Sequence, residues 1–344
     1  MSNQKRRLPA EWEPQSGVML AWPHGASDWA EMLGHVQPVV IEMVRHIARF
    51  ERVLLLVDAV APVRDSLAAA GVDMAQVQLV EIETNDTWTR DYGPLTVAED
   101  GGFRLLDFGF NGWGLKFASD QDNQASRRLH AAGIFGKLPL QTFGLIFEGG
   151  SVESDGAGTL LTTGDCLLSP NRNPQLTQAA IEAELKRAFG AEQVLWLGSG
   201  HLAGDDTDSH IDILARFAPE NTIVHMHCDD PADPHFDAFA AMHEELAGFT
   251  NVSGEPYRLV ALPWPKAKQN RFGDLVAPSY ANFLIINGAV LVPVYGDARD
   301  DEALAVIAGC FPGREVIGIQ CSPLIEQGGS LHCMTMQFPE GVLR

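Results

Sequence analysis

The sequence predicts an α/β fold made of about five similar units, repeated radially or as a solenoid. Helical periodicity with proline or glycine end signals begins at residues 62, 120, 174, 235 and 298, so successive starts lie 58, 54, 61 and 63 residues apart. Short β-rich runs lie between these helices. A fixed period of this size indicates units that bury their faces against their neighbours. A two-layer α/β fold with coincidental spacing is the alternative interpretation.

Each repeat combines strands with one helix. Helices are predicted at 62–70, 120–132, 174–189, 235–247 and 298–310, each ending at or shortly before a glycine. Strands are predicted at 52–57, 76–82, 103–108, 159–163, 222–227, 282–286 and 290–294. An N-terminal surplus remains, with a strand-like run at 18–22. We expect this surplus to close a ring by pairing with the last unit.

Length and composition indicate one folded domain spanning residues 1–344. The chain has 344 residues, of which 46% are hydrophobic and 20% are charged, which is ordinary globular usage. This composition argues against a disordered chain, a coiled coil or a collagen-like fibre. The sequence contains no low-complexity stretch or Gly/Ser linker, so we expect no second domain.

The charge balance restricts the classes of partner. With 24 Lys and Arg against 45 Asp and Glu, the formal net charge is −21. Such a field repels nucleic acid and anionic membranes and weakly favours a cationic substrate. No apolar run is long enough to span a membrane, and the N-terminus lacks a secretory pattern. The five cysteines form no Cys-x-x-Cys pair, so we expect no disulfide framework and a cytoplasmic protein.

Polar residues at equivalent strand starts would converge at the centre of such a ring. The candidates come from four segments and are Asp91, Glu148, His210, Asp212 and Cys333. His210 and Asp212 are two residues apart, so on the expected strand they would project to the same face. A thiol, an imidazole and three carboxylates would then share one pocket, which is a set suited to nucleophilic and acid–base catalysis.

Each candidate also has a purely structural interpretation. Cys333 lies in an expected apolar strand, 331–338, and can be a small core residue. His210 can be a hydrogen-bonded structural histidine, and Asp91 or Glu148 can be a turn residue. Asp212 is less ordinary, because an acid inside an apolar strand is destabilising unless it is paired.

Other kinds of site have weaker support. The sequence has no nucleophile elbow, phosphate loop or dinucleotide fingerprint. A metal site from His225, His227 and Asp229 is a minor alternative, because alternate strand residues share a face. The remaining cysteines lack an acidic and histidine-containing neighbourhood in the sequence and are predicted to be structural: Cys166, Cys228, Cys310 and Cys321.

Seven segments together resemble the agmatine deiminase family. They are Leu8–Pro14, Leu20–Pro23, Trp88–Pro94, Phe110–Gly114, Phe147–Gly150, Asp206–Asp212 with Arg216 and Phe217, and Gly328–Cys333. The resemblance runs from about residue 8 to residue 338. This family is related to bacterial peptidyl-arginine deiminases and belongs to the guanidine-modifying pentein superfamily. The resemblance therefore implies a five-bladed α/β propeller with pseudo-fivefold symmetry.

The resemblance also implies catalytic roles. Asp91 and Asp212 would grip the guanidinium, and Cys333 would attack its carbon as a thiolate. His210 would protonate the departing ammonia and then take a proton from water, and Glu148 would orient His210. This route requires no metal or organic cofactor. The residues leave open whether the thiolate exists beforehand or forms when substrate binds.

The identity of the substrate is less certain than the chemistry. The resemblance favours agmatine, a small cationic guanidine, with arginine or peptidyl-arginine as alternatives. Trp88 is expected to wall the pocket, and Asp208, in the acidic run from 205 to 208, is expected to help bind the distal amine. A non-catalytic propeller scaffold and a cysteine peptidase are alternatives from other classes. Ring folds of this size often form homo-oligomers, so self-association is a further expectation.

Overall fold

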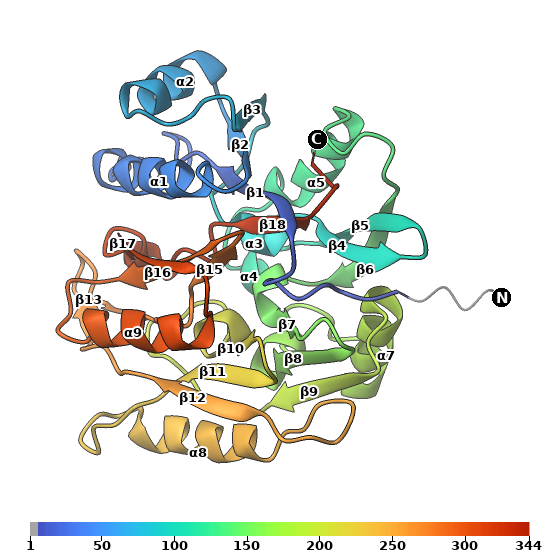
Figure 1. Ribbon diagram of the computed structural model, residues 1–344, viewed down its shortest axis with the longest axis vertical. Helices are drawn as coiled ribbons and strands as arrows, with labels where there is room; N and C mark the ends of the chain where they lie inside the picture. The colour runs from blue at the N-terminus through green and yellow to red at the C-terminus, as the bar shows by residue number, and fades with distance from the viewer. Residues whose placement is uncertain (1–5, 344) are drawn as a thin grey trace.

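Five sheet units of the same topology recur along the chain, and Figure 1 shows them following one another around the molecule. The computed structural model describes residues 6–343. In each unit, two antiparallel strands pair, and a helix then leads to a third strand that is parallel to its neighbour. The predicted repeat of strands plus one helix is confirmed.

Four units are continuous in sequence. The first of them comprises β4 (Leu95–Glu99), β5 (Gly102–Gly109), α5 (Asp122–Ala131) and β6 (Leu140–Ile146). The next comprises β7 (Val152–Ser154), β8 (Thr159–Thr163), α7 (Gln178–Phe189) and β9 (Gln193–Leu197). Then follow β10 (Ala215–Ala218), β11 (Thr222–Met226), α8 (Phe236–Ala247) and β12 (Arg258–Leu262). The last comprises β15 (Leu284–Ile286), β16 (Ala289–Val294), α9 (Asp300–Cys310) and β17 (Glu315–Gln320).

The fifth unit joins the two ends of the chain. It contains β18 (Met336–Pro339), β1 (Gln15–Ala21), α1 (Leu33–Ile47) and β2 (Arg52–Val57), and it is extended by α2 (Val60–Ala69) and β3 (Val77–Glu81). β1 pairs antiparallel with β18 and parallel with β2. The expected closure of the ring by the N-terminal surplus is therefore confirmed.

Short elements connect the sheets near the centre of the molecule. They are α3 (Thr89–Tyr92), α4 (Gly112–Leu115), α6 (Gly164–Leu167), the 3₁₀ turns η1 (Gly149–Ser151), η2 (Ile211–Ile213) and η3 (Ile325–Gln327), and the hairpin β13 (Lys268–Gln269) and β14 (Leu275–Val276). η1 packs against both α3 and η2. Segments that are far apart in sequence thus meet beside the ends of the strands.

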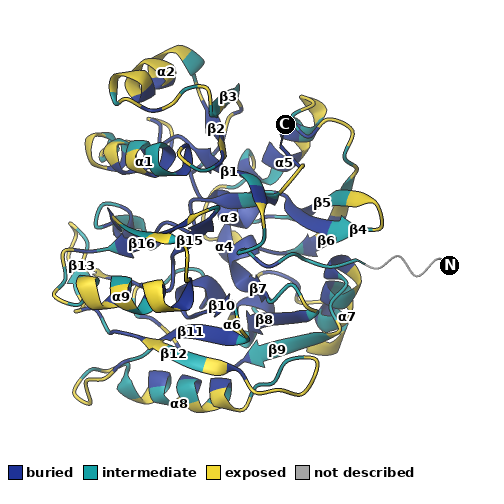
Figure 2. Ribbon diagram, in the orientation of Figure 1, coloured by how far each residue is buried: buried dark blue, intermediate teal, exposed yellow. Residues whose placement is uncertain are grey.

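The hydrophobic core lies between the sheets and their helices. β8 and β11 are buried along their whole length, and Figure 2 shows these two strands dark, whereas the outer faces of the helices are exposed. Strands buried on both faces are expected to be almost continuously apolar, as Val53–Val57 is. No helix within residues 6–343 has the length and apolar character needed to cross a membrane.

Two predicted strand segments proved wrong. Residues 211–213 form a 3₁₀ turn and β10 begins only at Ala215, while Cys333 lies in a turn before β18. The chain cannot extend before His210 because Asp208 and Ser209 both have left-handed backbone angles, with φ of 66° and 64°. The Asp205 carboxylate stabilises this bend by accepting the Ser209 N–H at 2.6 Å.

Candidate active site

A cavity of about 400 Å³ opens where the central segments meet. Asp91 and Cys333 line its buried end together with Trp88 and Trp113, whereas Phe272, which is 74% exposed, lies at its outer end. Trp88 also packs against Trp29, with ring centroids 5.8 Å apart. The cavity is therefore a pocket with carboxylate, thiol and aromatic groups at its base.

Cys333 is held by an asparagine, Asn282, that was not predicted to be a site residue. The Asn282 Nδ2 donates to the Sγ of Cys333 at 3.2 Å, and its Oδ1 accepts the Cys333 N–H at 3.3 Å. Burial, reinforced by the negative charges of Asp212 and Asp91, raises the pKa of the Cys333 thiol well above its ordinary value. The thiol is therefore protonated at neutral pH.

Asp212 uses its two oxygens differently. Its Oδ2 lies 2.7 Å from the Nδ1 of His332 and 3.5 Å from the Sγ of Cys333. Its Oδ1 is buried and has no hydrogen-bond partner. Burial would raise the pKa of Asp212, but the hydrogen bond and charge of His332 outweigh it and hold this pKa below its ordinary value. The ionised Asp212 thus has one oxygen beside the thiol and a second, buried oxygen without a partner.

A buried ionic network supports His332 from behind. The Nε2 of His332 lies 2.8 Å from the Oε1 of Glu11, and Glu11 also pairs with Arg90 at 3.0 Å and Arg216 at 2.5 Å. Burial opposes ionisation of Glu11, but His332 and the two arginines together hold its pKa well below the ordinary value. His332 is therefore held between two carboxylates, one at each ring nitrogen.

Asp91 faces the same space from α3. Its Oδ1 accepts the N–H of Gly150 at 2.9 Å, and its Oδ2 accepts the indole N–H of Trp113 at 2.9 Å. Burial raises the pKa of Asp91, and the charge of His210 offsets only part of this rise. Asp91 and Asp212 both interact electrostatically with Cys333, as expected for two carboxylates that flank one thiol.

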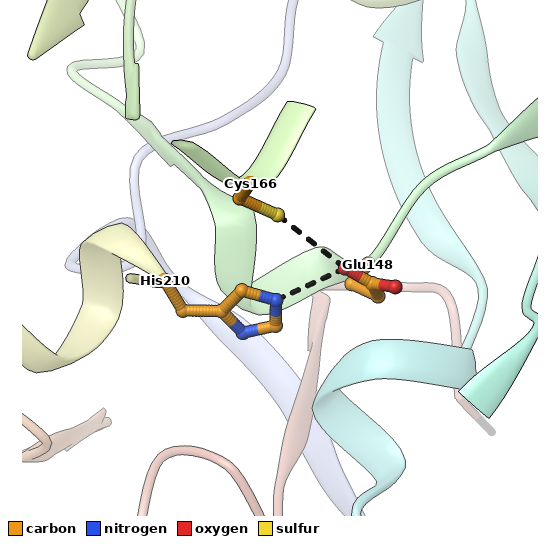
Figure 3. Close-up of side chains that lie close together, drawn as sticks. All are labelled: Glu148, Cys166 and His210. Carbon is orange, nitrogen blue, oxygen red and sulfur yellow. Dashed lines mark hydrogen bonds and ion pairs between the residues drawn. The ribbon is translucent and has the colours of Figure 1, made fainter. Parts of the chain in front are cut away.

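His210 and Glu148 form a buried pair (Figure 3). The Nε2 of His210 lies 3.1 Å from the Oε2 of Glu148, and Arg172 also donates to both oxygens of Glu148 at 2.8 and 3.0 Å. Although burial opposes it, the charge of Asp91 and further contacts raise the pKa of His210 well above its ordinary value. The Nδ1 of His210 has no hydrogen-bond partner and lies 3.6 Å from the Oδ1 of Asp91. The resting imidazole is therefore protonated, and its Nδ1–H has no hydrogen-bond acceptor.

Cys166 lies in surroundings that the sequence interpretation missed. Its Sγ donates to the Oε2 of Glu148 at 3.4 Å, so this cysteine does contact the acid–histidine pair (Figure 3). Burial, with the charge of Glu148, raises the pKa of Cys166 to about 11. The thiol thus remains protonated and is the third side chain, after His210 and Arg172, that donates to Glu148.

Two glycines admit the site's side chains. A Cβ on Gly150 would lie 2.7 Å from the Nδ1 of His210 and 2.8 Å from the Oδ1 of Asp91. A Cβ on Gly329 would lie 2.2 Å from the ring of Trp88. Neither contact is sterically possible without movement, so both glycines are required by close packing.

The acidic run 205–208 is divided among different tasks. Asp208 pairs with Arg172 at 2.6 Å and Lys116 at 2.7 Å, and it is not among the described residues that line the cavity. Asp206 does line it, and burial together with Asp205 raises the pKa of Asp206 to about 6. Arg271 lies on the same wall, from the β13–β14 hairpin. The carboxylate of this run that lines the mouth of the cavity is therefore Asp206, whereas the sequence interpretation had assigned substrate binding to Asp208.

The comparison with known families is decisive for classification. Residues 7–339 match the family of Porphyromonas-type peptidyl-arginine deiminases. The chain belongs to this family. An agmatine deiminase from Medicago truncatula is 33% identical over 96% of this chain and 96% of its own length. The family thus includes relatives named for two different guanidine substrates.

Solved structures of relatives agree over almost the whole chain. A C. jejuni agmatine deiminase variant with substrate bound has a TM-score of 0.91 at 35% identity, covering 100% of this chain and 99% of its own. A Porphyromonas gingivalis structure provisionally described as an arginine deiminase has a TM-score of 0.92 at 46% identity, covering 99% and 100%. An amidinotransferase from Microseira wollei, 12% identical with a TM-score of 0.57, shares the fold alone. The family member described here has the pentein fold.

Proposed function

We propose that this protein is an agmatine deiminase, which hydrolyses the guanidinium of agmatine to N-carbamoylputrescine and ammonia. The observation that carries the proposal is the ionised Asp212 carboxylate, whose Oδ2 lies 3.5 Å from the Sγ of Cys333 while its buried Oδ1 has no hydrogen-bond partner. A buried anionic acceptor without a donor is destabilising. A planar cation with N–H donors satisfies it.

The guanidinium binds between the two aspartates in this mechanism. Its N–H groups donate to Asp212 and Asp91, which hold the central carbon beside the Sγ of Cys333. Trp88 and Trp113 cover the ligand and exclude water, so the charge-assisted hydrogen bonds act in a medium of low dielectric constant.

The first half-reaction requires a change in protonation. The Cys333 thiol is protonated, and His210 already carries a proton, so His210 is not the initial base. The positive charge of the substrate favours the thiolate, and the thiol proton is released to solvent. The thiolate then forms the C–S bond. His210 donates its proton to the leaving nitrogen as the C–N bond breaks, giving ammonia and a covalent amidino-thioether.

The second half-reaction restores the enzyme. The neutral His210, oriented by Glu148, takes a proton from water, and the resulting hydroxide attacks the same carbon. Collapse of this adduct breaks the C–S bond, releases the hydroxyl proton to solvent and leaves the ureido product. Cys333 regains a proton when the product departs. These steps use only the side chains named above.

The mouth of the pocket bears on the distal end of the substrate. We assign the ammonium of agmatine to Asp206, whose carboxylate lines the cavity, is mostly buried and has a raised pKa that a bound cation would lower. Asp208, whose two oxygens already meet Arg172 and Lys116, instead holds these cations in place. Arg271 favours the second candidate substrate class, because its guanidinium can bind the carboxylate of arginine.

A substrate panel tests the proposal. The purified protein is incubated separately with agmatine, arginine and an arginine-containing peptide, and the ureido product is measured. We expect turnover of agmatine to exceed that of the other two substrates. Turnover of arginine or peptide without turnover of agmatine would contradict the proposed substrate and leave the deiminase chemistry standing. No ureido product from any of the three would contradict both.

A further inference from the structure

A cluster of three histidines lies outside the candidate active site, between β11 and α8. His225 and His227 come from the end of β11, and His243 comes from α8. Their ring centroids are separated by 5.1 Å (His225 and His243), 5.7 Å (His227 and His243) and 6.2 Å (His225 and His227). Figure 1 shows this helix alongside the sheet that contains β11.

His225 is prepared to act as a ligand. Its Nδ1 lies 2.9 Å from the backbone oxygen of Met226, so Nδ1 carries the hydrogen and the lone pair of Nε2 faces the Nδ1 of His243. A histidine whose second nitrogen donates to a carbonyl is the usual arrangement for metal ligation.

The spacing of the first two nitrogens fits a tetrahedral ion. The Nε2 of His225 lies 3.2 Å from the Nδ1 of His243. Zinc binds imidazole nitrogen at about 2.1 Å, so two ligands at a tetrahedral angle are separated by about 3.4 Å. The third ring, His227, has a buried Nδ1 without a hydrogen-bond partner. The three rings do not place ligand nitrogens within 4.8 Å of one another, so the His227 ring must rotate to complete the site.

The acidic residue that the sequence suggested as third ligand is occupied elsewhere. Asp229 forms an ion pair with Arg299 at 2.7 Å. His243, 14 residues further along the chain, instead completes the group from the packed helix. The metal site suggested from the sequence was therefore wrong in Asp229, and His243 from α8 lies beside His225 and His227 instead.

We propose that His225, His227 and His243 bind one divalent transition-metal ion that imidazole favours, such as zinc, and that the ion ties α8 to β11. His225 is paired in register with Ala215 of β10, the strand that follows His210 and Asp212. The ion would thus stabilise the sheet next to the pocket without contacting substrate. The donor set contains no thiolate, which separates it from the Glu148, Cys166 and His210 group.

Cobalt titration of the untagged, metal-free protein tests this assignment, because cobalt reports its ligands by its visible spectrum. We expect one bound ion with tetrahedral ligand-field bands and no thiolate charge-transfer band. His243→Asn and His227→Asn should each lose this ion, whereas His35→Asn, which alters an exposed histidine outside the cluster, should retain it. Zinc should raise the thermal midpoint of wild type but not of His243→Asn.

Several results would overturn the proposal. They are absence of binding by wild type, a thiolate charge-transfer band on the bound ion, and retention of the ion by either histidine variant. Circular dichroism of each variant establishes that it is folded before binding is measured. None of these measurements depends on catalysis, so failure here is distinguishable from failure of the proposed function.

Discussion

The Nδ1 of His332 lies 2.7 Å from the Oδ2 of Asp212, while the Oδ1 of the same carboxylate is buried without a partner. One oxygen is thereby held by the protein and the other has no protein partner. The opposite nitrogen of His332 is held by Glu11, which the N-terminal segment supplies. A residue near the start of the chain is therefore linked, through His332, to the carboxylate that lies 3.5 Å from Cys333 near its end.

Asp212→Asn should weaken the guanidinium clamp severely. The amide is neutral, and its NH₂ group cannot accept the substrate's N–H, so transition-state stabilisation should fall by about 2–5 kcal/mol. That corresponds to a loss of about 30-fold to several thousand-fold in kcat/KM for agmatine. Asp237→Asn, an exposed carboxylate on α8, is the control and should behave as wild type. A wild-type kcat/KM for Asp212→Asn would show that Asp212 does not bind the guanidinium.

His332→Gln should alter the pH dependence of binding. His332 lowers the pKa of Asp212, so its removal should raise that pKa and allow Asp212 to protonate at higher pH. Agmatine affinity is measured against pH in a Cys333→Ala background, where no turnover occurs. We expect the acidic loss of affinity to move to higher pH when His332→Gln is added. A uniform loss at every pH would indicate a merely structural role.

The Cys333 thiol should react slowly with neutral electrophiles in the free enzyme. Its pKa is raised well above the ordinary value, so the thiolate fraction should still be increasing at pH 9. Alkylation by iodoacetamide is followed by mass spectrometry of the peptide that contains Cys333. We expect the rate to rise continuously from pH 6 to pH 9. A rate that is constant over this range would show a thiolate present before substrate binds.

Asp206→Asn should raise the KM for agmatine selectively. Loss of a charged hydrogen-bond partner is typically worth about 1.5–3 kcal/mol, so an increase of about tenfold or more is expected. Asp274→Asn is the matched control, since Asp274 lines the same cavity but is exposed. The measurement is steady-state kinetics with agmatine and with a neutral alkylguanidine. Equal losses for both substrates would place the effect outside ammonium recognition.

Asp122→Asn should make the stability of the fold less dependent on pH between pH 5 and pH 8. Burial raises the pKa of Asp122 to about 8, although the N–H groups of Asn85 and Asp86 oppose the rise. The folded state then holds a proton that the unfolded state releases above about pH 4. Stability therefore falls as pH increases from about 4 to 8, and this contribution disappears in the variant. We expect thermal midpoints to fall less between pH 5 and pH 8 in Asp122→Asn, and an identical fall would contradict the assignment.

The repeat could be predicted from the sequence because its signals are local. Glycine and proline end signals located the helices, and the strands at 52–57 and 159–163 have the predicted bounds. Buried strands with apolar side chains on both faces leave a continuous pattern that requires no knowledge of the partner strand. The pairing of β1 with β18 followed from a surplus that had no other partner.

The site's supporting residues could not be predicted in the same way. These residues contact partners that are far away in the sequence. The side-chain partners of Asn282 are at least 51 positions away, those of Glu11 at least 79 and those of Arg172 at least 24. No local sequence pattern records such contacts. His332 stands next to Cys333 in the sequence, and that adjacency was the available signal. Asp208 was assigned from its acidic neighbours, whereas local backbone geometry decides which members of that run face the cavity.

Rapid acid quenching followed by peptide mass spectrometry tests whether Cys333 forms a covalent intermediate with agmatine. The protein is mixed with agmatine, quenched within a single turnover and digested. We expect an adduct of agmatine less one ammonia on Cys333, absent from Cys333→Ala and from the peptide containing Cys166. Two results would contradict the covalent mechanism on Cys333. One is turnover of agmatine without any such adduct in a slowed variant such as His210→Asn, and the other is an adduct on Cys166 instead.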